Sequence, residues 1–101
     1  MKPYIQCVKV TAQPNKYDQL IQQLQESSNL LKDIPECIYY LIGRTEEPNT
    51  ICIAELWTSK EAKDAFGARP EVAKELKDTF MPLVASIDRP TTATIIGGVG
   101  I

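Results

Sequence analysis

The stretch CIYYLIGRTEEPNTICIAELWT (residues 37–58) decides the fold of this chain. Two apolar runs, rich in Ile, Tyr and Leu, flank a polar segment that contains Pro48 and Asn49. Apolar, β-branched runs on either side of a short polar loop are typical of an antiparallel hairpin. We therefore expect one strand over residues 37–43, a loop over 45–50 and a second strand over 51–58.

The residues before the hairpin predict a strand followed by a helix. Residues 4–10 nearly alternate between apolar and polar side chains, as a half-buried strand does. Pro14 can open a helix at its first turn. Beyond it, apolar side chains recur at helical spacing at Tyr17, Leu20, Ile21, Leu24 and Leu31. Pro35 ends this helix, because a proline disfavours helical backbone in the residue before it.

The residues after the hairpin predict two helices and a last strand. Ser59 is a typical N-cap residue, so a helix is expected to follow it and to end near Gly67. A second helix is expected from about residue 71, with apolar positions at Val72, Leu76, Phe80, Leu83 and Val84. Pro90 precedes a last strand over residues 91–96, and we expect the glycine-rich residues 97–101 to form a flexible tail.

The expected order of elements is β-α-β-β-α-α-β in 101 residues, which is the size of one domain. With right-handed crossovers, this order predicts an α+β protein with a ferredoxin-like βαββαβ fold. Helices would then cover one face of a four-stranded antiparallel sheet. We expect residues 1–101 to form a single domain.

Both faces of the hairpin strands are apolar, which points to a second copy of the chain. One face carries Ile38, Ile42, Ile51, Ile53 and Trp57, and the other carries Tyr39, Leu41, Cys52, Ala54 and Leu56. A sheet with one solvated face normally alternates apolar and polar residues. Since the helices can cover only one face, we expect a homodimer through the other. A short sheet with tolerated surface aliphatic residues is the alternative.

The composition excludes several classes of protein. There are 11 Lys and Arg, 13 Asp and Glu and no His, for a net charge of −2. The basic residues are scattered, which argues against nucleic acid, and no apolar stretch is long enough to span a membrane. Without His, the Ser-His-Asp and Cys-His catalytic sets and His metal sites are excluded. The chain has no dinucleotide fingerprint either, so we expect neither a metal nor a cofactor.

The cysteines and the amino terminus indicate a cytoplasmic protein. Cys7, Cys37 and Cys52 form no C-x-x-C pair, and an odd number does not fit a disulfide scaffold. The first residues lack the apolar core of a signal peptide. We expect three reduced, mostly unreactive thiols.

The hairpin predicts a candidate site on one face of the sheet. If it closes around Glu47 and Pro48, the facing pairs are Tyr40 with Glu55, Ile38 with Trp57 and Ile42 with Ile53. We expect this face to meet the helices, from which Phe66 and Leu76 would project. A carboxylate beside a phenol could exchange protons with a phenolic substrate. Two alternatives stay open, namely that Glu55 only anchors the fold and that Trp57 is only a core residue.

The segment from Glu55 to Ala62, Glu-x-Trp-x-Ser-x-Glu-Ala, follows a hairpin and opens a helix. In this it resembles the antibiotic biosynthesis monooxygenase family. Residues 10–18 and the segment Pro35-Glu36-Cys37-x-x-Tyr40 add to the resemblance, which covers about 90 residues. The resemblance implies a dimeric α+β barrel that oxidises quinols or polyphenols without a cofactor. The electron-rich substrate would itself reduce oxygen, while aromatic residues hold it between sheet and helices.

On this reading, Trp57 and Tyr40 position a small aromatic ring, and Glu55 assists deprotonation of its hydroxyl. Phe66 stands where many relatives have a His and would close the pocket. Ile38, Ile53 and Leu76 would line it. A second hypothesis is a non-catalytic dimeric barrel that binds an apolar small molecule, which the absence of His favours. A third is an isomerase on the same architecture.

Overall fold

The computed structural model describes residues 2–100. Five strands, three α-helices and three short helical segments follow one another along the chain. They are β1 (Tyr4–Ala12), α1 (Tyr17–Ser27), the 3₁₀ segment η1 (Ser28–Leu31), β2 (Cys37–Arg44), β3 (Thr50–Trp57), α2 (Lys60–Gly67), α3 (Pro70–Glu75), the π-helical η2 (Leu76–Phe80), the 3₁₀ segment η3 (Met81–Leu83), β4 (Val84–Ile87) and β5 (Thr91–Thr94).

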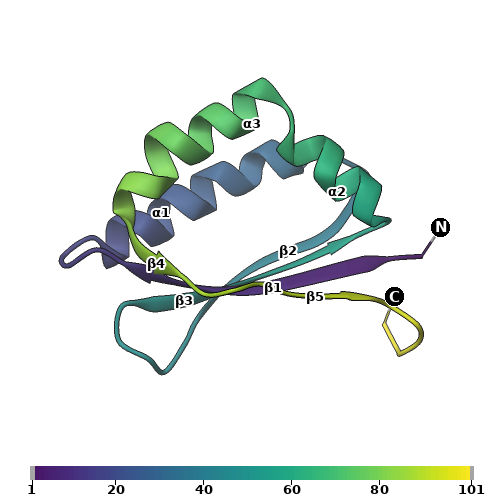
Figure 1. Cartoon of the computed structure of the whole chain (residues 1–101), viewed down its shortest axis with the longest axis horizontal. Coiled ribbons are helices and arrows are strands. Elements are labelled where there is room, and N and C mark those ends of the chain that lie inside the picture. The colour runs from purple at the N-terminus through teal and green to yellow at the C-terminus, as the bar shows by residue number, and fades with distance from the viewer. Residues whose placement is uncertain (1, 101) are drawn as a thin grey trace.

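The strands form one antiparallel sheet in the order β2-β3-β1-β4, and β5 also pairs with β1. All three α-helices lie on the same side of this sheet, as Figure 1 shows. This is the α+β, ferredoxin-like arrangement that the sequence predicted. The hairpin joining β2 and β3 is also confirmed, with Tyr40 paired to Glu55 and Ile42 to Ile53.

The edge of the sheet beside β1 differs from the sequence-based prediction. Instead of one last strand there are two, because β4 pairs with Val10–Ala12 and β5 pairs with Tyr4–Cys7. The chain leaves the sheet between them at Asp88-Arg89-Pro90, where Pro90 has no N–H to donate. β4 and β5 therefore lie one after the other along the same edge of β1, and together they take the place of the single last strand that was expected.

Two helix boundaries also differ from the expected ones. The first helix begins at Tyr17 and not at Pro14, because Asn15 has a positive φ of 65° that turns the chain before the helix. Val84 begins a strand, whereas its spacing from Phe80 had placed it on a helix. By contrast, Ser59 caps α2 as predicted, since its Oγ accepts a hydrogen bond of 3.1 Å from the N–H of Ala62.

The main core lies between α1 and the sheet. Its buried members are Val10, Ala12, Leu20, Leu24, Ile51, Ile53, Phe80, Leu83 and Val84. Burial of each large aliphatic side chain contributes about 1.5–3 kcal/mol. Four of these residues, Val10, Leu24, Ile53 and Phe80, also line the cavity of the candidate site, which therefore adjoins the core.

The sheet face away from the helices is largely apolar. Cross-strand rows on this face join Ile5 to Leu56 and Tyr39, and Cys7 to Ala54 and Leu41. Leu41 is 59% exposed and Tyr39 45% exposed. Within residues 2–100, no α-helix packs on this face (Figure 1).

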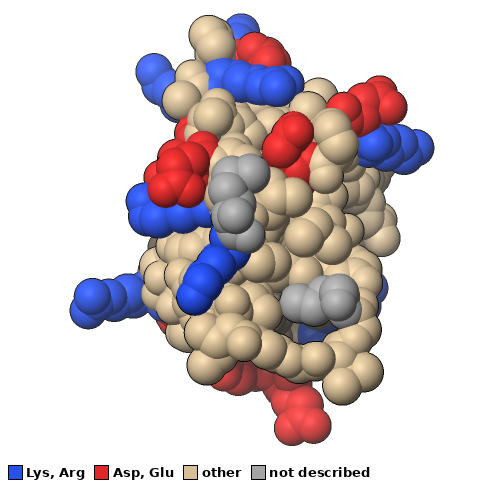
Figure 2. Space-filling model, turned by 90° about the vertical axis from the view of Figure 1, so that its right-hand side faces the viewer, with Lys and Arg blue, Asp and Glu red and all other residues tan. Residues whose placement is uncertain are grey.

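Charged side chains of both signs are scattered over the surface seen in Figure 2, with uncharged surface between them. Within the described residues, no helix is long and apolar enough to cross a membrane.

Candidate active site

The floor of the candidate site is a row of three polar residues on adjacent strands. Gln6 of β1 pairs with Glu55 of β3, which pairs with Tyr40 of β2. Apolar side chains, among them Ile53, flank this row, and all of these residues line one cavity under the helices. The sequence predicted that Tyr40, Glu55 and Trp57 would share the helix-facing side of the sheet, and they do.

Ile38 does not join this group. The β2–β3 register shifts between Cys37 and Tyr39, so that Cys37 and not Ile38 lies opposite Trp57. An extra residue in one strand breaks the alternation of side chains at that point. As a result Ile38 is 39% exposed and is not among the residues that line the cavity.

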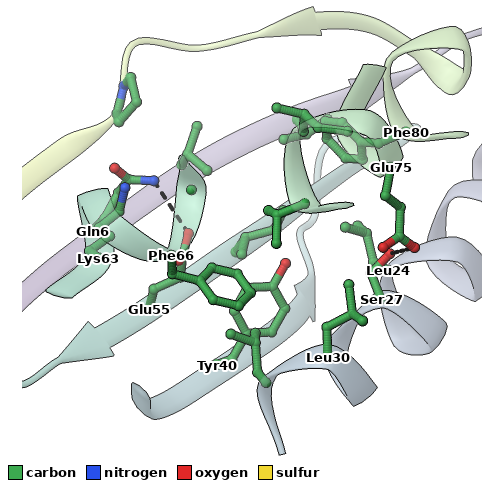
Figure 3. Close-up of a pocket in the computed structure, with 18 of the residues that line it drawn as sticks. Gln6, Leu24, Ser27, Leu30, Tyr40, Glu55, Lys63, Phe66, Glu75 and Phe80 are labelled. Carbon is green, nitrogen blue, oxygen red and sulfur yellow. Dashed lines mark hydrogen bonds between the residues drawn. The ribbon is translucent and has the colours of Figure 1, made fainter. Parts of the chain in front are cut away.

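The Glu55 carboxylate is held by two neutral donors. Trp57 donates from Nε1 to Oε1 over 3.1 Å, and Gln6 donates from Nε2 to Oε2 over 3.3 Å. The second of these bonds is drawn in Figure 3. Among the described residues, the Tyr40 hydroxyl does not donate to this carboxylate. These two bonds fix the orientation of the carboxylate and still leave lone pairs free, since a carboxylate offers about four acceptor sites.

An aromatic wall closes the site beside Glu55. Trp57 is 1% exposed, and its ring centroid lies 5.4 Å from that of Phe66 in a tilted arrangement. The guanidinium of Arg69 also contacts Phe66, and lies 5.5 Å from the centroid of its ring. Because the Ser59 cap starts α2 directly after β3, it helps to bring Phe66 over the strand that carries Trp57. Trp57 is thus both a core residue and a wall of the cavity.

The cavity has a volume of about 330 Å³ and opens at an apolar rim. At this rim Leu76 is 51% exposed, with Leu30 and Ile87 nearby. Ligand pockets commonly measure about 300–1,000 Å³, so this one suits a small ligand. A cavity of roughly 150 Å³ in another protein holds benzene. The space here is therefore enough for one substituted ring or two fused rings.

Four polar residues of the cavity were not singled out by the sequence. They are Gln6 on β1, Ser27 at the end of α1, Lys63 on α2 and Glu75 at the end of α3. For Glu75 a signal existed, because it interrupts the apolar stripe between Val72 and Leu76. Gln6 likewise interrupts the apolar positions Tyr4, Val8 and Val10 on one face of β1, but that it meets Glu55 depends on the β1–β3 register.

Two side chains at or near the site, Tyr40 and Cys37, have a raised pKa. Burial, with smaller contributions from the negative charges of Glu55, Cys37 and Glu75, raises the pKa of the Tyr40 phenol above its usual range. Burial and the Glu55 carboxylate raise the pKa of the Cys37 thiol to about 11. Both groups are protonated at neutral pH. Figure 3 shows the Tyr40 hydroxyl directed into the cavity, where it can act as a hydrogen-bond donor.

The fold and this site can now be compared with known proteins. The family described as "Antibiotic biosynthesis monooxygenase" matches residues 3–78. The chain belongs to this family. The matched segment includes the floor, the aromatic wall and Leu76, whereas Ile87 and Pro90, which also line the cavity, lie beyond it.

Solved structures described as putative antibiotic biosynthesis monooxygenases have the same fold. A "putative Antibiotic biosynthesis monooxygenase" from Chloroflexus aurantiacus J-10-fl is 30% identical, with 98% of each chain covered and a TM-score of 0.82. A protein of the same description from Deinococcus radiodurans is 21% identical, with 97% of each chain covered and a TM-score of 0.81. No curated protein matches the sequence.

Proposed function

We propose that this protein is a cofactor-independent monooxygenase that oxidises a small aromatic quinol or polyphenol with O₂. Family membership and the names of similar structures support a monooxygenase in general terms. The observation that carries the proposal is the polar row Gln6–Glu55–Tyr40 beneath an aromatic wall in a cavity of about 330 Å³. This arrangement combines apolar walls with a few polar groups, as small-molecule sites do.

In the proposed reaction, Glu55 accepts the proton of a substrate hydroxyl. The resulting phenolate gives an electron to O₂ far more readily than the neutral phenol does. The carbon–oxygen bond then forms at the ring, and one oxygen atom leaves as water. The sum is quinol + O₂ → hydroxyquinone + water, in which the substrate loses four electrons and O₂ gains four. Tyr40 would donate a hydrogen bond to a substrate oxygen, and Trp57 and Phe66 would pack against the ring.

Oxygen uptake with a panel of quinols tests this proposal. The wild-type chain is expected to consume O₂ above the uncatalysed rate and to release a hydroxyquinone that carries ¹⁸O from labelled O₂. Replacing Glu55 by Gln should lower the rate about 10²–10⁴-fold, the usual contribution of a general base. Glu46→Gln, in the exposed hairpin loop, is the matched control. An uncatalysed rate with every quinol, or full activity in Glu55→Gln, would contradict the proposal.

A non-catalytic binding protein is the second candidate. It is favoured by the two hydrogen bonds that Glu55 already accepts from Trp57 and Gln6, which are also what an anchoring residue would show. In that case an aromatic ligand would bind the wild-type chain without oxygen uptake. The same panel, measured by calorimetry in the absence of O₂, distinguishes the two candidates.

We also propose that the working form is a cytoplasmic homodimer. The apolar sheet face, with Leu41 and Tyr39 exposed, supports an interface with a second copy. Three free thiols, Cys7, Cys37 and Cys52, suit a reducing compartment.

A further inference from the structure

The cavity contains a second carboxylate that the proposed reaction does not use. Glu75, the last residue of α3, is half-buried and lines the helical wall. Two side chains of α1 hold it. The Oε1 of Glu75 accepts hydrogen bonds of 3.0 Å from Nε2 of Gln23 and 2.8 Å from Oγ of Ser27.

Both of these donors bind the same oxygen of Glu75. Within residues 2–100, no side chain or backbone group donates to its Oε2, and none of the ion pairs found there includes Glu75. In this respect it differs from Glu55, both of whose oxygens accept a hydrogen bond. Among the described residues no buried side-chain oxygen lacks a hydrogen-bond partner, so the Oε2 of Glu75 is accessible to solvent and, since Glu75 lines the cavity, can accept from a ligand donor there.

The two carboxylates lie on different walls of the cavity. In Figure 3, Glu55 extends from the sheet beside Gln6, and Glu75 extends from the helical layer beside Ser27. The Tyr40 hydroxyl lies between the two carboxylates. The negative charges of both carboxylates contribute to the raised pKa of Tyr40, which agrees with this placement. A flat ligand that contacts Glu55 at one end can therefore reach Glu75 at the other.

We propose that Glu75 is a ligand-binding residue whose Oε2 accepts a hydrogen bond from a hydroxyl remote from Glu55. The cavity then selects aromatic ligands with hydroxyls at two ends over ligands with one. The inference rests on the same site as the proposed function, but it concerns binding and does not require turnover.

Replacement of Glu75 by Gln separates this role from a purely structural one. The amide oxygen of Gln can still accept the bonds from Gln23 and Ser27, while the amide NH₂ replaces Oε2. The variant keeps the contact between α1 and α3 but presents a donor to the cavity where the wild type presents an acceptor. A structural role predicts no change in ligand preference.

The test is anaerobic calorimetry with three probes of one size: a para-naphthohydroquinone, the matching naphthol with one hydroxyl, and the matching naphthoquinone. The wild type should bind the naphthohydroquinone about tenfold or more tightly than the naphthol, as expected for a hydrogen bond to a charged group. In Glu75→Gln this ratio should fall to about one, and the naphthoquinone, which offers carbonyl acceptors, should gain affinity. Glu71→Gln, an exposed change on the same helix, should behave as the wild type.

An unchanged preference in Glu75→Gln overturns the inference, as does a wild type that binds none of the probes. If Glu75→Gln does not fold by circular dichroism, Glu75→Asp withdraws the acceptor by one methylene and should give the same loss of ratio. Oxygen uptake is scored separately. If the preference for the naphthohydroquinone over the naphthol depends on Glu75 but no oxygen is consumed, this inference is supported and the proposed function is rejected. If oxygen is consumed but Glu75→Gln leaves the preference unchanged, the proposed function is supported and this inference is rejected.

Discussion

The indole N–H of Trp57 donates a hydrogen bond of 3.1 Å to the carboxylate of Glu55, two residues earlier on the same strand. Residues at this spacing point to the same face of a sheet, so β3 supplies one residue of the aromatic wall and one of the polar floor. The bond also fixes the plane of the Glu55 carboxylate relative to the indole. Any change at Trp57 is therefore expected to affect both stability and ligand geometry.

Trp57→Ala should lower the free energy of unfolding by about 3–5 kcal/mol, because it removes a fully buried aromatic side chain and its packing on Phe66. Trp57→Phe keeps a ring at the wall but loses the N–H, and it should cost about 1–2 kcal/mol. Leu76→Ala, at the exposed rim, should change stability by about 0.5 kcal/mol or less. Urea denaturation measures all three. A Trp57→Ala variant as stable as Leu76→Ala would show that the indole is not a packing element.

Leu41→Glu should convert the proposed dimer into a monomer of 11.3 kDa. It places a charge on the apolar sheet face, at the most exposed large apolar residue of the edge strand β2, where a second copy would have to desolvate it. Met81→Glu is the matched control, since Met81 is also an exposed apolar residue but lies in the helical layer. Sedimentation equilibrium gives the masses. A wild-type chain that is monomeric at micromolar concentration would contradict the predicted interface.

Thiol labelling should report on the same interface. Cys7 and Cys52 lie on the sheet face away from the helices, so a dimer should protect them and Leu41→Glu should expose them. Cys37 should react slowly in both forms at pH 7, because a pKa of about 11 leaves a thiolate fraction on the order of 10⁻⁴. The sites are identified by mass spectrometry after a short pulse of reagent. Equal labelling of Cys7 and Cys52 in both forms would argue against an interface on this face.

Stability should fall as the pH rises above about 9. Cys37 has a raised pKa in the folded chain, so between its ordinary value of 9.0 and about 11 it ionises in the unfolded chain while it stays protonated in the folded one. Tyr40 adds to the same effect from its ordinary value of 10.0 upward. The unfolded state is thereby favoured, and below pH 9 neither group contributes. The free energy of unfolding, followed from pH 8 to 11, should fall less steeply in Tyr40→Phe and Cys37→Ala than in the wild type.

The residues of the hairpin were predictable because their arrangement is local. Two apolar runs around a short loop determine which residues pair, so Tyr40 opposite Glu55 and Ile42 opposite Ile53 follow from spacing. The N-cap at Ser59 is equally local. Ile38 is the exception within the hairpin, since a bulge depends on how the strand entering from Pro35 and Glu36 is held, and Thr58 donates to the Glu36 carbonyl there.

The sequence by itself determined the α+β class, the order of most elements and the face on which Glu55 and Trp57 lie, because side-chain periodicity is a short-range property. Only the tertiary structure decided which residues complete the site. Gln6 reaches Glu55 across 49 positions of sequence, and Gln23 reaches Glu75 across 52. Such contacts arise when the core between α1 and the sheet fixes distant elements side by side, and no local pattern encodes which polar side chains will then meet.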